Sequence, residues 1–291
     1  FHFGFFSLEI DENIFHSDSL FSAICNNYVA EYSSEKIESF IENFPKITSI
    51  FYGYKSPKKE ILLIPRPLNK KIPNKEYEKC RKAVKKAKFI EISLINESLE
   101  NRDDIKLIGN CLVEENYIDE DFSLYEDIVE EKIAIDRIKG VVKEGALFYV
   151  SGILVKEKAF LYFLIDCDKI SEELKRSIEL LEVFGIGGEI SSGFGQVKVK
   201  IENFDKNILA NTGEEYTNLS LVIPKNEEIE NIKLWDIIER KGYVYQTNLL
   251  KKSIHAIKEG SVFKRPIEGN VIKVTENAYR YGKAFLVSFV E

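Results

Sequence analysis

The spacing of hydrophobic residues predicts two helices near the N-terminus. Residues 1–10 are rich in Phe and predict a strand before these helices. Apolar residues then recur at intervals of three and four, which is the period of one helix face. They are Leu20, Phe21, Ile24 and Tyr28, followed by Ile37, Phe40, Ile41 and Phe44. Ser17 is the expected N-cap of the first helix, and Pro45 ends the second.

A hairpin and a long insertion follow. Residues 49–54 and 60–64 predict two strands joined by a turn at residues 55–57. Residues 67–135 lack the alternation of a strand. We therefore expect an insertion here that is partly helical around residues 75–88 and loose or acidic beyond them.

Ordered elements return after the insertion. Two strands, Ala146–Val155 and Lys158–Asp166, are joined by a short polar turn. Ser171 caps the next helix, which ends at Gly185. The buried face of that helix is expected to consist of Leu174, Ile178, Leu181 and Phe184. After a glycine-rich loop, alternation in Gln196–Phe204 predicts a strand with one wet face.

This order of elements indicates a fold class. Without the insertion it is the βαββαβ plan of a ferredoxin-like domain, which RRM-type RNA-binding domains share. Residues 205–215 predict a linker. The remaining elements are a strand at Tyr216–Ile223, a helix at about 228–240, a strand at Tyr243–Gln246 and further strands ending at Ala284–Val290.

We therefore expect an α+β protein with tandem ferredoxin-like (RRM-like) domains, the second of them reduced. The first domain would cover residues 1–205 and contain the insertion at about 65–135. The second would cover residues 206–291.

Composition limits the class of protein. The 291 residues are 44% hydrophobic and 31% charged, which is typical of a folded chain, and no apolar run reaches the length of a membrane span of about 18 residues. We expect a cytoplasmic protein. The four cysteines are far apart and the three histidines are scattered, so no metal site and no cofactor are expected.

Charge is unevenly distributed along the insertion. The net charge of the whole chain is −7. Residues 55–88 contain 13 Lys/Arg and 3 Asp/Glu, or +10, whereas residues 91–131 contain 2 Lys/Arg and 14 Asp/Glu, or −12. Such a split predicts an electrostatic footprint of limited extent, or two blocks that neutralise each other.

The most informative stretch is Gly185–Gly195, with five glycines in eleven residues. It lacks the Gly-Lys-Ser/Thr of a P-loop, and it follows a helix and precedes a strand, which is the wrong context for a dinucleotide site. Bare backbone N–H groups and the hydroxyls of Ser191 and Ser192 could hold phosphates or sugars. The alternative is a connection without a ligand.

Other candidates are polar residues near predicted element boundaries. His16 and Asp18 flank Ser17 at a helix start, where they could perform acid–base chemistry, cap the helix or contact a partner. Arg66 lies between two prolines and Arg137 follows an aspartate, so each could bind a phosphate or form a surface ion pair. The segments 259–263 and 278–282 combine glycine with aromatic residues and could stack on bases or form ordinary turns.

Together these segments resemble a known family. Phe15–Ala23 (FHSDSLFSA) and Gly185–Gly195 resemble the HSDTLFSA motif and the C-terminal glycine-rich loop of the RAMP superfamily. Four further motifs follow the order seen in the fourth subunit of Csm-type (type III-A) CRISPR effector complexes. They are Leu63–Pro67 (LIPRP), Ile135–Arg137 (IDR), Glu259–Phe263 (EGSVF) and Tyr279–Ala284 (YRYGKA).

The resemblance implies a non-catalytic, RNA-binding subunit of a ribonucleoprotein for antiviral defence. Such a subunit holds the repeat-derived 5′ handle of the crRNA, and it contacts the large polymerase/cyclase-like subunit and a backbone RAMP subunit. A thumb-like insertion in its first domain approaches the guide–target duplex. The residues implied in RNA binding are His16, Ser17, Arg66, Arg137, Gly187, Gly188, Ser191, Ser192, Gly193 and Phe194.

An enzyme is the main alternative. A repeat-cleaving endoribonuclease of the same superfamily would use His16 as a general base. The acidic second half of the insertion departs from an element near RNA and could face a protein partner instead.

Overall fold

The two helices near the N-terminus are confirmed, but the cap of the first is not. The computed structural model describes residues 14–136, 141–188, 190, 193–209, 213–242, 250, 252–275 and 278–291. Helix α1 spans Ser17–Tyr32 and α2 spans Ile37–Glu42. The N-cap of α1 is His16, because Ser17 is already helical and its hydroxyl accepts a hydrogen bond from the Leu221 N–H at 3.0 Å. The strand expected at residues 1–10 lies outside the described residues.

The first half of the chain is built on a six-stranded sheet. Its order is β5-β6-β4-β3-β2-β9, and the predicted hairpin forms its β2 and β3. The strands are β2 (Phe51–Lys55), β3 (Glu60–Pro65), β4 (Phe89–Glu91), β5 (Ile105–Ile108), β6 (Cys111–Glu114) and β9 (Ala159–Tyr162). A small ribbon pairs β1 (Lys46–Ile47) with β10 (Ile165–Asp166).

The insertion is more ordered than expected. Helices α3 (Asn74–Lys79) and α4 (Ala83–Lys86) confirm the helical stretch. The prediction of a loose region beyond these helices is wrong, because three segments of that region form β4, β5 and β6 of the sheet. Strand β4 is buried at all three positions, so its sequence lacks the alternation that would reveal it.

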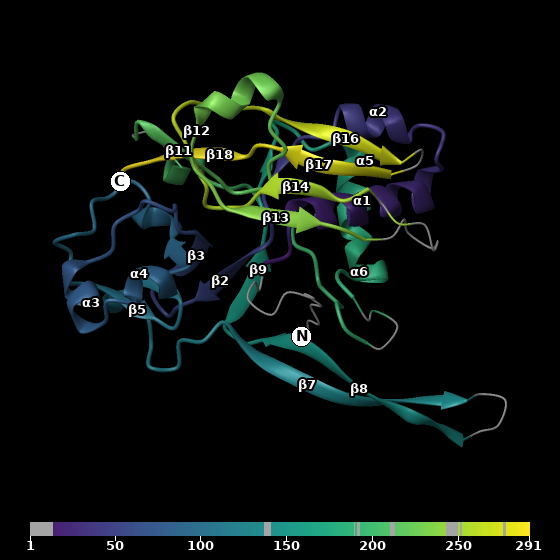
Figure 1. Cartoon of the computed structure of the whole chain (residues 1–291), viewed down its shortest axis with the longest axis horizontal. Helices are drawn as coiled ribbons and strands as arrows, with labels where there is room; N and C mark the ends of the chain where they lie inside the picture. The colour runs from purple at the N-terminus through teal and green to yellow at the C-terminus, as the bar shows by residue number, and fades with distance from the viewer. Residues whose placement is uncertain are drawn as a thin grey trace.

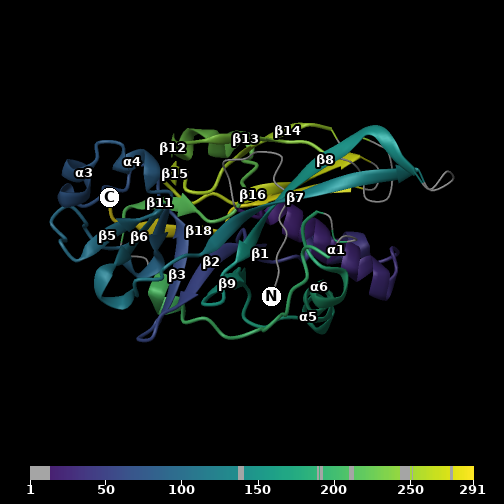
Figure 2. The same ribbon diagram turned by 90° about the horizontal axis from the view of Figure 1, so that it is seen from below.

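A long antiparallel hairpin leaves the sheet. It consists of β7 (Tyr125–Asp136) and β8 (Val141–Val155), so the predicted strand at 146–155 is longer than expected. The hairpin projects beyond the rest of the molecule in both ribbon views (Figures 1 and 2).

Helices α5 (Glu172–Glu179) and α6 (Leu181–Phe184) lie beside α1 (Figure 1). The cap is confirmed, since the Ser171 hydroxyl accepts from the Leu174 N–H at 3.2 Å. Phe184 is 45% exposed, so it does not belong to the buried face. The prediction of a strand at 196–204 is wrong. Exposure alternates along residues 196–200, but this segment pairs with no strand among the described residues.

The second half combines one sheet with two ribbons. The sheet has the order β12-β15-β11-β18, and the ribbons pair β13 with β14 and β16 with β17. These strands are β11 (Glu215–Asn218), β12 (Ile232–Leu234), β13 (Ile237–Arg240), β14 (Ile254–Ile257), β15 (Val262–Phe263), β16 (Gly269–Thr275), β17 (Ala278–Lys283) and β18 (Leu286–Phe289). The short 3-10 helices are η1 (Ile92–Leu94), η2 (Glu115–Tyr117), η4 (Lys206–Leu209) and η5 (Asn226–Asn231).

The helix predicted at about 228–240 is wrong. Its residues form part of η5 and the strands β12 and β13, in which isoleucines pair across to β15 and β14. The strand predicted at Tyr216–Ile223 is shorter than expected, and the one at Tyr243–Gln246 lies outside the described residues.

Both halves share a hydrophobic core. Buried residues of the first sheet, such as Phe51 and Ile90, lie in one cluster with Val262 and Val287 of the second sheet. A second cluster joins α1 and α2 to β17 through Tyr281, which stacks on Phe21 at 5.1 Å between ring centroids. The molecule is therefore a mixed α+β protein whose two halves pack directly on each other.

Candidate nucleic-acid interface

The glycine-rich loop is closed at its base by the backbone. The Ile186 N–H donates to the Gly195 carbonyl at 2.9 Å. A Cβ atom on Gly195 would lie 2.0 Å from the Ile186 oxygen, and one on Gly185 would lie 3.0 Å from the Gly195 oxygen. Both glycines also have positive φ, +74° at Gly185 and +71° at Gly195. Only glycine meets both demands, so the base of the loop depends on these two residues.

The centre of the loop has a different character. Gly187 and Gly193 also have positive φ, +91° and +90°. Gly187 and Gly188 are partly exposed and Gly193 is exposed, with no atom within 4 Å of the position of a Cβ. Backbone N–H groups here can be approached closely by a ligand. Ser191 and Ser192 lie outside the described residues, as does Arg137.

Phe194 anchors the loop. Its side chain is only 6% exposed, and its ring packs on Gly152 of β8, where a Cβ would lie 3.0 Å from the ring. The Lys132 ammonium of β7 lies 5.1 Å from the ring centroid. Ile186, at the base of the loop, is buried in the hydrophobic cluster that contains residues of α1. The ring of Phe194 is therefore covered by the hairpin and offers no face on which a base could stack.

His16, Ser17 and Asp18 are buried at the contact between the two halves. His16 is 6% exposed, and its Nδ1 lies 2.9 Å from Oε1 of Glu259. The Ser49 hydroxyl donates to the same carboxylate. Burial favours a raised pKa of Glu259, but the charge and hydrogen bond of His16 and the hydrogen bond of Ser49 lower it below its usual value. Glu259 thus remains an anion in the interior.

Asp18 is held between two arginines. Arg280 Nη1 donates to Oδ2 at 2.9 Å, and Arg240 binds both carboxylate oxygens at 3.0 Å each. Asp18 is 2% exposed and Arg280 is 5% exposed. Burial favours a raised pKa of Asp18, but the two arginines and His16 hold it below its usual value. The motifs near residues 16, 259 and 280 therefore bind each other rather than a surface ligand.

Arg66 is committed to the protein backbone. Its Nε donates to the Ala87 carbonyl at 2.7 Å and its Nη2 to the Val84 carbonyl at 3.0 Å. Its Nη1 donates to the carbonyls of Pro67 and Lys70. The guanidinium therefore fastens the end of α4 to the sheet through contacts with four carbonyls. The phosphate contact expected for Arg66 stays a prediction.

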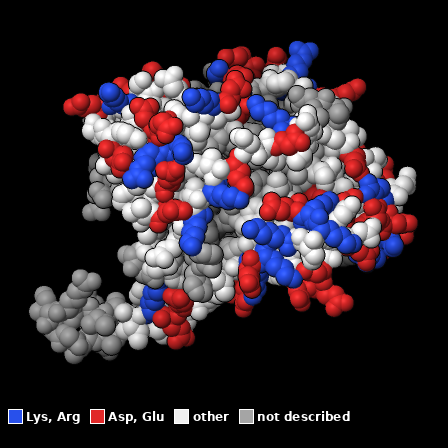
Figure 3. All heavy atoms as spheres, turned by 180° about the vertical axis from the view of Figure 1, so that it is seen from behind, with Lys and Arg blue, Asp and Glu red and all other residues white. Residues whose placement is uncertain are grey.

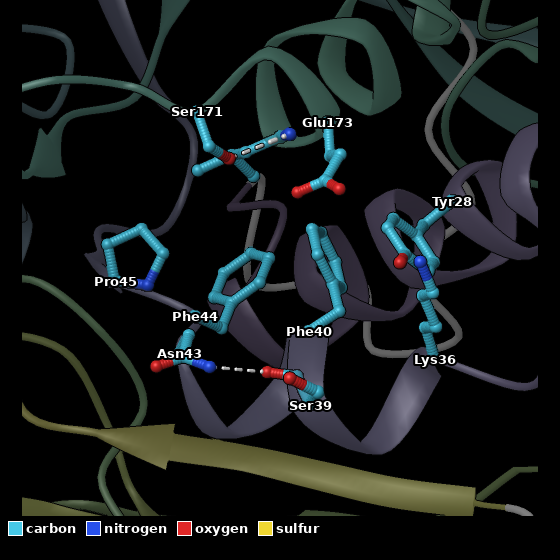
Figure 4. Close-up of a pocket in the computed structure, with 10 residues that line it drawn as sticks. Tyr28, Lys36, Ser39, Phe40, Asn43, Phe44, Pro45, Ser171 and Glu173 are labelled. Carbon is cyan, nitrogen blue, oxygen red and sulfur yellow. Dashed lines mark hydrogen bonds between the residues drawn. The ribbon is translucent and has the colours of Figure 1, made fainter.

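A cavity lies near the helices. It has a volume of about 250 Å³ and lies between α2, α1 and the start of α5 (Figure 4). Phe40 and Phe44 form one wall, and Glu173 faces them from α5. Its polar lining includes the hydroxyls of Ser39 and Ser171, the amine of Lys36 and the carboxylate of Glu173. The described residues also contain no cluster able to ligate a metal ion.

Sequence reasoning missed the partners of its own motifs. No motif in the sequence points to Arg240, and the motifs that contain Glu259 and Arg280 predict base stacking or family membership, not a buried contact with residues 16–18. Phe263 and Tyr281 of those segments are buried, at 0% and 1% exposure. Separations of 222 to 262 residues between partners leave no local signal that could have paired them. No described helix is long and apolar enough to cross a membrane.

Two family models match the chain. The RAMP superfamily matches residues 8–198, and the CRISPR Csm4 C-terminal domain matches residues 211–289. A Csm4 protein from Methanocaldococcus jannaschii is 32% identical, over 99% of this chain and 94% of its own length. One from Streptococcus thermophilus is 23% identical, over 94% of this chain and 88% of its own length.

Solved structures agree with these relatives. A chain in the crystal structure of the Csm3–Csm4 subcomplex of the type III-A CRISPR-Cas interference complex has a TM-score of 0.72 and 27% identity, covering 100% of this chain and 98% of that one. A chain of a Csm1–Csm4 cassette in complex with cA4 has a TM-score of 0.57 and 17% identity, covering 97% and 95%, which is a likeness of fold. The chain therefore belongs to the Csm4 family within the RAMP superfamily.

Proposed function

We propose that this chain is a non-catalytic subunit of a type III-A CRISPR effector complex and binds the 5′ handle of the crRNA with its glycine-rich loop. Membership of the Csm4 family supports the first part. The partners we propose are a backbone RAMP subunit and the large subunit, because the similar solved chains were crystallised in a Csm3–Csm4 subcomplex and in Csm1–Csm4 cassettes.

One observation supports the role of the loop most directly. Its base is fixed by Ile186, Gly195 and the buried Phe194, while its centre has bare backbone at partly or fully exposed glycines. A braced loop with accessible N–H groups suits the phosphates of single-stranded RNA, because contacts that are already ordered cost little entropy on binding.

The proposal assigns two different roles to the ten residues implied by the family resemblance. Gly187, Gly188 and Gly193 would contact the RNA, together with Ser191, Ser192 and Arg137. His16, Ser17 and Phe194 would position the protein framework that supports the loop, because their side chains are buried. Arg66 would hold α4.

The domain organisation is part of the same proposal. We propose two ferredoxin-like domains, 1–205 and 206–291, the second reduced. For the thumb-like element we propose the β7–β8 hairpin rather than the whole segment 65–135, because the hairpin is the part that projects (Figures 1 and 2). Its exposed apolar side chains, among them Val129 at 63% and Tyr149 at 60%, suit contact with a partner.

Replacement of one loop glycine tests this function. The chain would be co-expressed with its backbone and large subunits and a repeat–spacer RNA, and the RNA retained by the purified assembly would be sequenced. We expect a uniform, repeat-derived 5′ end, which becomes ragged or is lost with Gly193→Asp, because a carboxylate in the loop repels phosphate.

Gly109→Asp is the matched control. Gly109 has a φ of +60°, is exposed, and has no atom within 4 Å of the position of a Cβ, as at Gly193. The control should retain uniform ends. Uniform ends with Gly193→Asp would refute handle binding by this loop.

The alternative nuclease would have to use His16. The purified chain would be incubated with repeat RNA in the absence of metal. Cleavage at one position that His16→Ala abolishes would overturn the non-catalytic assignment. We expect no such cleavage, because His16 is buried against Glu259.

A further inference from the structure

Many carboxylates in the acidic half of the insertion pair with nearby basic residues. Glu91 and Glu114 bind Lys59, and Glu100 binds Lys71. Arg102 binds Glu97, Asp104 and Glu114. Further pairs join Lys106 to Glu115, Lys156 to Glu126 and Lys158 to Asp119. The back of the molecule shows the same intermingling of signs (Figure 3).

These pairs do not involve the basic cluster on α3 and α4, where cations outnumber carboxylates. Residues 75–88 contain seven Lys/Arg and two Glu, a net charge of +5. Glu76 binds Lys79, and Glu78 is exposed. Five exposed cations take part in no ion pair among the described residues, and we call them the α3–α4 patch: Lys75, Arg81, Lys82, Lys85 and Lys86.

The patch is held on a firm support. Helices α3 and α4 pack on each other, and Ala83 and Ala87 are buried in the core beneath α4. Arg66 donates to the carbonyls of Val84 and Ala87, so the end of α4 is fastened to the sheet. Lys82, Lys85 and Lys86 lie on the same side of α4, since residues three and four apart are neighbours on a helix surface.

The chemistry of the patch favours RNA over a protein partner. Lysine is depleted in protein–protein interfaces, whereas clustered lysines with no counter-charge are the electrostatic footprint of a nucleic-acid contact. Tyr77, which is 47% exposed, adds an aromatic face on which a base could stack. A protein interface would need an apolar centre, and the exposed apolar side chains of this segment are Tyr77 and Val84, at 47% and 39%.

We infer that the α3–α4 patch is a second RNA-binding surface, separate from the glycine-rich loop, that holds the phosphate backbone without reading its sequence. The inference does not depend on handle binding. It predicts that the chain binds single-stranded RNA lacking any repeat sequence, and that salt weakens this binding steeply. Five phosphate contacts give a slope of about −3.5 in log K against log salt, from about −0.7 per contact.

The test measures affinity by fluorescence anisotropy, using the full chain and a labelled, unstructured RNA without repeat sequence. The patch variant is Lys82→Glu/Lys85→Glu/Lys86→Glu. The control, Lys225→Glu/Lys264→Glu/Arg265→Glu, changes net charge equally at exposed residues of the second half. We expect the patch variant to bind the RNA at least about 10-fold more weakly. Its slope of log K against log salt should become shallower, at about −1.4, because two contacts remain. The affinity of the control variant should stay within about twofold of that of the unaltered chain.

Other results would overturn the inference. Absence of RNA binding by the unaltered chain would do so, as would equal weakening by both variants, which would indicate a general charge effect. Unchanged RNA affinity with loss of a partner subunit from the co-purified assembly would identify the patch as a protein contact. Handle binding is judged separately, by the response of RNA 5′ ends to Gly193→Asp.

Discussion

At the scale of single residues, the most unusual group is the buried carboxylate of Asp18. It lies between Arg240 and Arg280, at the junction of the two halves of the chain. A buried ion of this kind is stable only when its charge and hydrogen bonds are satisfied. The His-Ser-Asp motif could be found in the sequence, but its role could not, because Glu259 and the two arginines come from segments more than 200 residues away.

Replacement of Asp18 should reveal this role. Asp18→Asn should lower the free energy of unfolding by about 3–5 kcal/mol at pH 7, because it leaves buried arginine charge uncompensated. The pKa of Asp18 is lowered in the folded state, so its contribution is fully present above the usual aspartate pKa of about 3.9. It is lost as the pH falls through the lower, folded value.

The difference between Asp18→Asn and the unaltered chain should therefore be constant from pH 7 to about pH 5 and should shrink below about pH 4. Urea unfolding at several pH values measures it. Asp168→Asn, at an exposed carboxylate that lies 3.9 Å from the Lys206 ammonium, is the matched control and should change stability little. A similar small effect for Asp18→Asn would show that the junction does not depend on this ion.

At the scale of elements, local signals predicted what local forces determine. Apolar residues spaced three and four apart predicted α1 and α2, and the capping residue Ser171 predicted the start of α5. The strands of the insertion were missed because β4 and most of β6 are buried on both faces and show no alternation. The helix expected at about 228–240 failed because its isoleucines are used in pairing with β14 and β15, a tertiary effect that no local pattern contains.

The coupling of the loop to the hairpin is a testable relation between elements. Phe194→Ala should lower the local stability of the loop base by about 3 kcal/mol, since it removes a buried ring. Hydrogen exchange of the Ile186 amide, which donates to Gly195, should become about 100-fold faster.

Phe148→Ala provides the comparison, because Phe148 lies on β8 and is 45% exposed. It should leave the Ile186 amide protected. Equal protection of that amide in Phe194→Ala would mean that the ring does not brace the loop.

At the scale of the whole molecule, charge is unevenly distributed over a chain of net charge −7. Acidic and basic residues pair over much of the insertion, whereas the cations of the α3–α4 patch take part in no ion pair among the described residues. The sequence left open whether the two charged blocks neutralise each other. The structure shows that the acidic block pairs mostly with lysines and arginines outside the patch. Which lysines remain unpaired depends on the folded arrangement, so composition could not have identified them.

The central claim is that the glycine-rich loop touches the 5′ handle. The most direct measurement is photocrosslinking in the assembled complex, with a photoreactive thiouridine in the handle of the crRNA and mass spectrometry of the crosslinked peptides. The account predicts crosslinks to the peptide that contains Gly187–Phe194, and their loss in Gly193→Asp but not in Gly109→Asp. Crosslinks confined to other segments or to other subunits would contradict it.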